Sequence, residues 1–198
     1  MARTRAVDYE DKQRHILDTA AAVVTDVGVE KSSMAEIARQ AGISKALLYH
    51  YYQSKDELVL DIVRRHLFNL DTALDHADDI SLTPPERLER LVSAVIDQYE
   101  NAGKLHQVQQ NCMGNLPDAM AEDIRDIDRQ IVRRFADVIE QINPHLLNER
   151  HRLMPVTMTL FGTFNWIYMW FRDDGNLSRE DYSKLLTQVF LNGVNSLK

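Results

Sequence analysis

The sequence contains a single cysteine, Cys112, among its 198 residues. One thiol cannot form an internal disulfide or a multi-cysteine metal site, which indicates a reducing compartment. No apolar run approaches the roughly 20 residues that a membrane-spanning helix needs, and the stretch MARTRAVDYEDK lacks the apolar centre of a signal peptide. We therefore expect a cytoplasmic protein with no membrane partner. Cys112 is expected to be a small buried side chain, with a redox-sensing thiol as the alternative.

The sequence also lacks the short motifs of common enzyme classes. It has no nucleophile elbow, no glycine-rich phosphate loop and no paired-carboxylate signature. His66, His76 and His106 stand alone, and His145 and His151 lie six positions apart across an expected helix break, so none shows metal-ligand spacing. We thus expect no catalysis, no metal and no other cofactor.

The net charge of -7 is unevenly distributed along the chain. Residues 1–56 contain eight lysines or arginines and eight acidic residues, so the other 142 residues carry the whole negative excess. An acidic protein is unsuited to coating nucleic acid non-specifically, because that binding depends on basic residues that displace counterions from phosphates. A neutral head with clustered basic residues on an acidic body favours contact with DNA at one end only.

Apolar residues recur at helical spacing along nearly the whole chain, and no alternating segment is long enough for a sheet. The predicted fold class is therefore all-α, with about nine helices. Three helices are expected in a head, residues 1–54, and the others in a ligand-binding and dimerisation body, residues 55–198. Gly103 is expected to end one body helix, followed by a separate short helix at 104–114. Pro155 is expected either in the first turn of its helix or at a kink.

Two short helices separated by a glycine turn are predicted within the head. Ser33 and Glu36 form a capping box that opens the first, and Gly42 ends it. Ser44 is the hydroxyl N-cap of the second, whose body is 45–51. This order of helix, tight turn and helix is typical of a helix-turn-helix, in which the second helix reads DNA.

The second of these helices has a predicted inner and outer face. Leu48 and Tyr52, four positions apart, can lock it onto the first helix, which turns the other side chains outward. Lysine suits a phosphate or guanine edge, leucine a thymine methyl, and tyrosine or histidine a phosphate oxygen. The predicted DNA-binding residues are Ser33, Ser44, Lys45, Ala46, Leu47, Tyr49, His50, Tyr51 and Lys55, with Arg3 and Arg5 as a minor-groove arm. Alternatively, Leu47 and His50 are ordinary exposed residues and the arm contributes only general charge.

The run SSMAEIARQAGISKALLYHYYQSKDEL resembles the N-terminal domain of TetR-family repressors. The similarity extends over about residues 10–60 and lies in its glycine, alanine, serine-lysine, LYHYY-like and SK-x-x-L positions. It implies a homodimer whose two heads enter successive major grooves of a palindromic double-stranded DNA operator, and a small molecule in the body that releases the DNA. Short helix pairs with a glycine turn also occur elsewhere, so a helical ligand-binding or enzymatic dimer without DNA function is the competing interpretation.

Six of the fifteen aromatic residues fall within residues 161–171. A helix that is apolar almost all round should be buried against its own core and against a second subunit. Similarity to the TetR family implies that the last two helices of each subunit form a four-helix dimer interface. The predicted interface residues are Phe161, Gly162, Trp170, Phe190 and Gly193.

The stretch GTFNWIYMWFRDDGNLSREDYSKLL is similar to the C-terminal region of a TetR subgroup that contains acyl-CoA-responsive repressors. This similarity implies a CoA thioester as effector, with its acyl group in an apolar tunnel; a drug-like or aromatic molecule is the alternative. The predicted pocket residues are Tyr99, Asn111, Met113, Met120, Phe135, Phe164, Asn165 and Trp166. For each of them taken singly, a place in the ordinary core is the competing interpretation.

Overall fold

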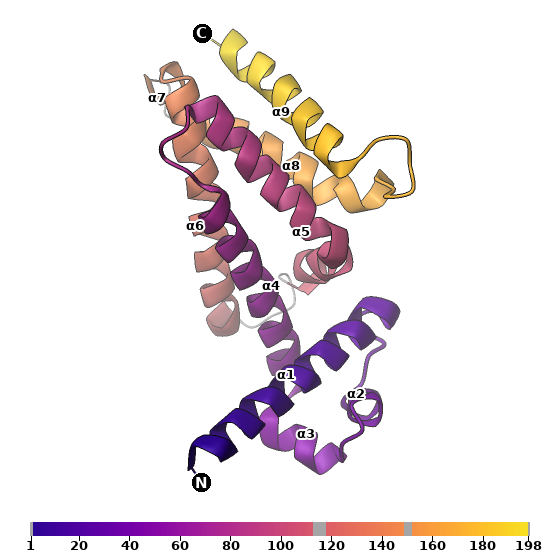
Figure 1. Cartoon of the computed structure of the whole chain (residues 1–198). Helices are drawn as coiled ribbons and strands as arrows, with labels where there is room; N and C mark the ends of the chain where they lie inside the picture. The colour runs from indigo at the N-terminus through magenta and orange to yellow at the C-terminus, as the bar shows by residue number, and fades with distance from the viewer. Residues whose placement is uncertain (1, 113–117, 149–151, 198) are drawn as a thin grey trace. The chain divides into compact units, whose positions relative to one another are not determined.

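The computed structural model describes residues 2–112, 118–148 and 152–197, and every regular element in these ranges is an α-helix (Figure 1). The all-α prediction is confirmed. By packing, the chain forms two compact units: Met1–His66 with Lys104–Ile124 (unit 1), and Leu67–Gly103 with Arg125–Lys198 (unit 2). The division between residues 54 and 55 stays a prediction, and the head shares its compact unit with a segment of the body.

Unit 1 begins with α1 (Ala2–Val27), α2 (Met34–Gln40) and α3 (Lys45–Tyr51). Because α1 begins at Ala2, Arg3 and Arg5 lie in its first turns. Their contact with a minor groove stays a prediction, now made from a helix end. Alanine and arginine are good helix formers, and no proline or glycine interrupts the chain before the amphipathic part of α1.

The turn between α2 and α3 follows the predicted pattern. The Ser33 hydroxyl accepts from the backbone N–H of Glu36 at 3.2 Å, and the Ser44 hydroxyl accepts from that of Leu47 at 3.1 Å. Gly42 has a φ of +64°, in the left-handed region that favours glycine. The predicted caps and the glycine turn are confirmed.

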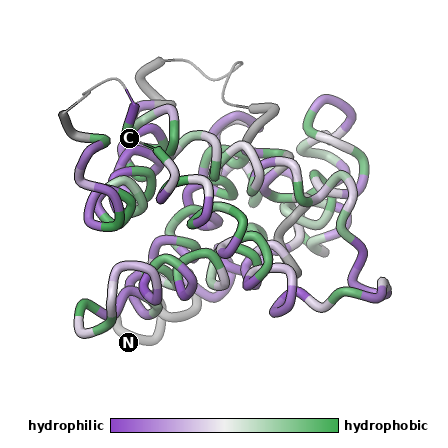
Figure 2. The backbone as a smooth tube through the Cα atoms, turned by 90° about the horizontal axis from the view of Figure 1, so that it is seen from above, coloured by the Kyte–Doolittle hydropathy of each residue, from purple (hydrophilic) through white to green (hydrophobic). Residues whose placement is uncertain are grey.

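Apolar stripes of the helices pack together in the core of unit 1. Figure 2 shows apolar and polar residues alternating along the helices, as amphipathic helices require. The buried side chains of this core include Ile16, Leu17, Ala20, Val23, Val24, Ile37, Ala38, Leu48, Leu58, Ile62 and Val63.

Three long helices, α4 (Lys55–Ala77), α5 (Pro84–Cys112) and α6 (Asp118–Ile142), contribute residues to both units. The helix α5 runs through Gly103, so the expected helix end there and the separate helix at 104–114 are wrong. An internal glycine costs about 1 kcal/mol relative to alanine and keeps its backbone hydrogen bond, so it need not end a helix.

Unit 2 also contains α7 (His145–Asn148), α8 (Leu153–Trp170) and α9 (Arg179–Ser196). Pro155 is the third residue of α8, which agrees with the first-turn alternative. Phe135 of α6 lies in the core, with its ring centroid 5.2 Å from that of Phe161 and 5.7 Å from that of Phe164. Among the described helices, none combines the length and hydropathy needed to cross a membrane.

Candidate functional site

The helix α3 presents one face to the protein and the other to solvent. Leu48 and Tyr52, the residue that follows α3, are buried in the core of unit 1. This observation confirms the predicted inner face. On the outer side, Tyr51 is half-buried, and the exposed side chains are Lys45, Ala46, Leu47, Tyr49 and His50.

Aromatic contacts order this exposed face. Tyr9 of α1 stacks on Tyr51 with ring centroids 4.7 Å apart, and His50 meets the edge of Tyr51 at 5.7 Å. The Lys45 ammonium lies 5.8 Å from the centroid of the Tyr49 ring, within cation–π range. Sequence reasoning missed Tyr9, because its role depends on how α1 packs across α3.

A hydrogen-bonded group around Tyr52 fixes α3 relative to its neighbours. The Tyr52 hydroxyl donates to Asp61 of α4 at 2.8 Å and accepts from Gln13 of α1 at 3.3 Å. Burial, followed by the bond to Asp61, raises the pKa of Tyr52, so the hydroxyl keeps its proton. Arg65 of α4 also pairs with Asp18 of α1 at 2.7 Å. The Tyr52 bonds thus hold the end of α3 against α1 and α4, and the ion pair holds α4 against α1.

Lys55, a predicted DNA contact, and Arg39, another cation of the head, have partners within the protein. The Lys55 ammonium donates to the carbonyl oxygens of Val29 at 2.8 Å and Ser32 at 3.3 Å, in the connection between α1 and α2. Arg39 donates twice to Glu36, and these bonds, with a further one from Gln40, lower the pKa of Glu36 to about 2. Contact between Lys55 and a phosphate stays a prediction. A phosphate would compete with two carbonyl oxygens for the hydrogen bonds that the ammonium donates.

The described members of the predicted pocket lie in different surroundings. Tyr99 is buried, and burial followed by the charge of Asp128 raises its pKa. Phe135 and Phe164 belong to the phenylalanine core of unit 2, and Asn165 is half-buried. Trp166 is 59 % exposed, which does not agree with a place in an internal pocket. Met113 and the side chains of Asn111 and Met120 lie outside the described residues.

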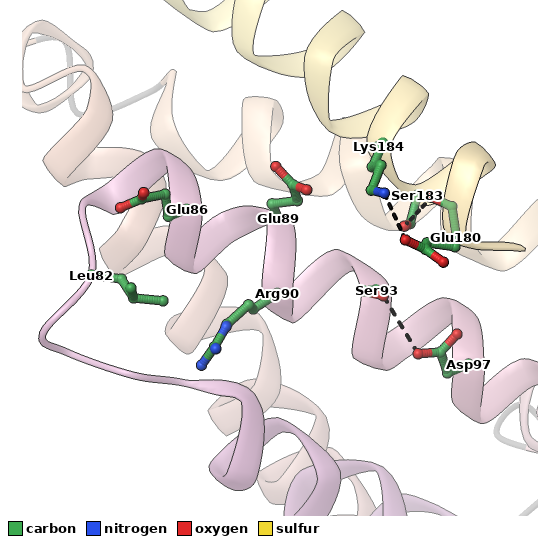
Figure 3. Close-up of a pocket in the computed structure, with 9 residues that line it drawn as sticks. All are labelled: Leu82, Glu86, Glu89, Arg90, Ser93, Asp97, Glu180, Ser183 and Lys184. Carbon is green, nitrogen blue, oxygen red and sulfur yellow. Dashed lines mark hydrogen bonds and ion pairs between the residues drawn. The ribbon is translucent and has the colours of Figure 1, made fainter.

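A hollow of about 690 Å³ lies between α5 and α9 of unit 2 (Figure 3). Its lining is mainly charged, and none of the predicted pocket residues contributes to it. Lys184 bonds Glu180 across one helical turn at 2.6 Å, and Ser93 bonds Asp97 at 3.4 Å. Two pairs of side chains in this hollow thus satisfy each other, and its charged lining does not suit an acyl chain.

An apolar surface lies on α8 and α9, which we call the α8–α9 face. Its exposed large side chains are Met154, Met158, Trp166, Met169, Trp170, Leu185 and Val189. A Cβ added at Gly162 or Gly193 would meet nothing within 4 Å, so both positions leave room for a close neighbour. Phe161 packs inward on Phe135, and Phe190 is half-buried. Monomeric proteins rarely expose a contiguous apolar patch of this kind.

Comparisons with known proteins agree with this arrangement of a head and a helical body. Residues 16–62 match the family described as bacterial regulatory proteins, tetR family. Residues 81–194, more than half of the chain, match the family described as tetracyclin repressor-like, C-terminal domain. This chain belongs to the tetR family.

Individual members of the tetR family resemble the chain over different lengths. The repressor KstR2 of Mycobacterium tuberculosis is 24% identical over 197 residues, which cover 96% of each protein. The activator FasR of Mycolicibacterium smegmatis is 34% identical over 99 residues, so the match spans 50% of this chain and 45% of FasR. These relatives are named as transcriptional regulators of the tetR type, not as enzymes.

Solved tetR-family structures share the fold over nearly the whole chain. A regulator from Bordetella parapertussis has a TM-score of 0.83 and 28% identity, and the match covers 94% of this chain and 97% of that one. AibR in complex with isovaleryl coenzyme A and operator DNA has a TM-score of 0.77 and 25% identity, with 90% and 97% covered.

Proposed function

We propose that this tetR-family protein is a cytoplasmic, dimeric repressor that binds a palindromic operator through α3 and is released by a small-molecule effector. The observation that carries the DNA-binding part is the exposed face of α3, with Lys45 and Tyr49 held outward by buried Leu48. In a helix-turn-helix dimer, two such helices enter major grooves about 34–36 Å apart. Similarity to KstR2 over 96% of both chains favours repression, because the match to the activator FasR is confined to half of this chain.

The α8–α9 face supports the dimer. Its exposed tryptophans, methionines and aliphatic residues lose contact with water when a second copy covers them, which is favourable at about 25 cal/mol per Å² of apolar area. Two-fold pairing of one surface with itself is the commonest arrangement of soluble dimers. Gly162 and Gly193 let helices of the two subunits approach closely.

We further propose an acyl-CoA thioester as the effector. The support is the similarity to AibR, whose solved complex contains isovaleryl coenzyme A, together with the resemblance of the C-terminal stretch to acyl-CoA-responsive regulators. A drug-like or aromatic effector is the second candidate. A ligand at 100 times its dissociation constant stabilises a protein by about 2.7 kcal/mol, so thermal unfolding with CoA thioesters and with aromatic compounds separates the two.

Operator binding is the test of the main proposal. DNA from upstream of the protein's own gene is titrated with the wild type and with the Lys45→Ala/Tyr49→Ala double variant. Loss of base and phosphate contacts in both subunits predicts at least roughly tenfold weaker binding. Lys184→Ala removes a lysine of α9 as the matched control and should bind like the wild type. Unchanged affinity of the double variant would exclude α3 as the DNA-reading element.

A further inference from the structure

Two buried histidines of unit 1 lie close together on α4 and α5. His66 and His106 are each 5 % exposed, and their ring centroids are 6.2 Å apart with planes inclined by 57°. Gln109, three positions after His106 on α5, is 4 % exposed. Burial of polar side chains is unfavourable unless hydrogen bonds replace those lost from water, so such a cluster calls for an explanation.

The Nε2 atom of His66 is buried and has no hydrogen-bond partner among the residues that the structure describes. Burial, and secondarily the charge of His106, lowers the pKa of His66 to about 4, so the ring is neutral near pH 7. A neutral imidazole can donate one hydrogen bond and accept one. A buried ring nitrogen of His66 is therefore available to an incoming polar atom.

The residues around His66 limit which chemical group of a ligand could bind its ring nitrogen. Ile62 and Val63, one helical turn earlier on the same face of α4, are buried. The neighbouring arginines of α4 point elsewhere, since Arg64 pairs with Asp123 and Arg65 with Asp18. Neither arginine is therefore free to pair with a carboxylate at His66, whereas a neutral carbonyl oxygen on an apolar group fits both the ring and these buried neighbours.

We propose that His66 is the effector-contacting residue of this regulator, and that its Nε2–H donates a hydrogen bond to the thioester carbonyl oxygen of a bound acyl-CoA. This inference rests on the proposed function and specifies the atom that recognises the effector. His106 lines the same site from α5. Unit 1 contains both histidines and the head. On the same helix as His66, Asp61 accepts a hydrogen bond from Tyr52, the residue that follows α3, and Arg65 pairs with Asp18 of α1. A ligand at His66 thus lies in the same compact unit as the DNA-reading helix.

The experiment compares each thioester with the thioether that lacks only the carbonyl oxygen. Isovaleryl-, octanoyl- and hexadecanoyl-CoA, and the matching S-alkyl-CoA compounds, are titrated by calorimetry into the wild type, His66→Phe and His66→Gln. His66→Phe keeps a ring but removes both nitrogens, and His66→Gln keeps an N–H donor. His76→Phe, at an exposed position near the end of α4, is the matched control. Ligand-free unfolding of each variant is measured in parallel.

The wild type and His76→Phe are expected to bind the preferred thioester at least roughly tenfold more tightly than its thioether. His66→Phe should bind the two compounds equally, and His66→Gln should recover part of the preference. Because the Nε2 atom is unpartnered without ligand, His66→Phe should unfold at or above the wild-type midpoint. The proposal is overturned if His66→Phe keeps the preference, if it unfolds well below the wild type, or if no thioester binds the wild type.

Operator binding by the wild type separates this inference from the function on which it rests. If the wild type binds operator DNA but no thioester, the role of His66 fails and the DNA-binding proposal stands. If thioesters bind with the expected carbonyl preference but no operator is bound, the regulatory proposal fails and the ligand contact stands.

Discussion

The ring of Tyr9 stacks on the ring of Tyr51 at 4.7 Å with an interplanar angle of 26°, joining α1 to the last residue of α3. An aromatic pair contributes about 0.5–1.5 kcal/mol beyond its area burial. Tyr9→Ala is expected to loosen the end of α3 and weaken operator binding by about two- to tenfold in an anisotropy titration. Tyr9→Phe keeps the stacked ring and should bind like the wild type. An equal loss in both variants would instead point to the Tyr9 hydroxyl as a DNA contact.

Lys55 supports the connection between α1 and α2 through the carbonyl groups of Val29 and Ser32. Lys55→Met should lower the free energy of unfolding by about 1–3 kcal/mol, because a charged donor and its part-buried acceptors lose their bonds. Urea unfolding measures this loss, with Lys31→Met as the control for removing an exposed lysine charge. The salt dependence of operator binding should stay the same. A slope smaller by about 0.9 for each lost phosphate contact, with unchanged stability, would assign Lys55 to DNA.

The depressed pKa of His66 makes folding stability depend on pH. Its pKa is about 4 in the folded protein against 6.5 for the ordinary side chain. Between these values the unfolded chain binds a proton that the folded chain does not, so stability falls as the pH is lowered through this window. The full effect is at most about 3 kcal/mol. Urea unfolding from pH 7 to pH 4.5 measures it, and His66→Phe should show a shallower pH dependence. Equal slopes in the two proteins would contradict the burial argument.

The α8–α9 face is the predicted contact between two copies of the chain. Val189 is 62 % exposed on α9, and Val189→Lys would place two unpaired charges in the proposed interface. The dimer dissociation constant should rise roughly thirtyfold or more, as measured by sedimentation velocity across a range of concentrations. Ile80→Lys changes an 85 % exposed apolar residue between α4 and α5 and is the matched control. Dimers of Val189→Lys as stable as those of Ile80→Lys would place the interface elsewhere.

Features that depend on neighbouring residues were predictable from the sequence. The caps at Ser33 and Ser44 and the turn at Gly42 involve bonds between groups at most five positions apart, so residue type and spacing suffice to predict them. The inner face of α3 is also predictable, because helical periodicity places Leu48 and Tyr52 on one side. The candidate DNA surface therefore follows from local chemistry.

Features that join distant parts of the chain were not predictable in this way. Lys55 is of a residue type that commonly binds phosphate, yet its ammonium binds carbonyl groups more than twenty positions earlier in the chain. Trp166 has the apolar character of a pocket residue, yet it lies on an exposed face of α8. His66 and His106 stand alone in the sequence and come within 6.2 Å in the fold.

The all-α class, the helix-turn-helix and the outward residues of α3 could be predicted from residue order alone, because hydrogen bonding within a few positions and helical periodicity are local properties. The stacking of Tyr9 on Tyr51 and the approach of two buried histidines became visible in the folded structure. These relationships depend on which helix faces meet, and that is set by the packing of side chains that are far apart in the chain.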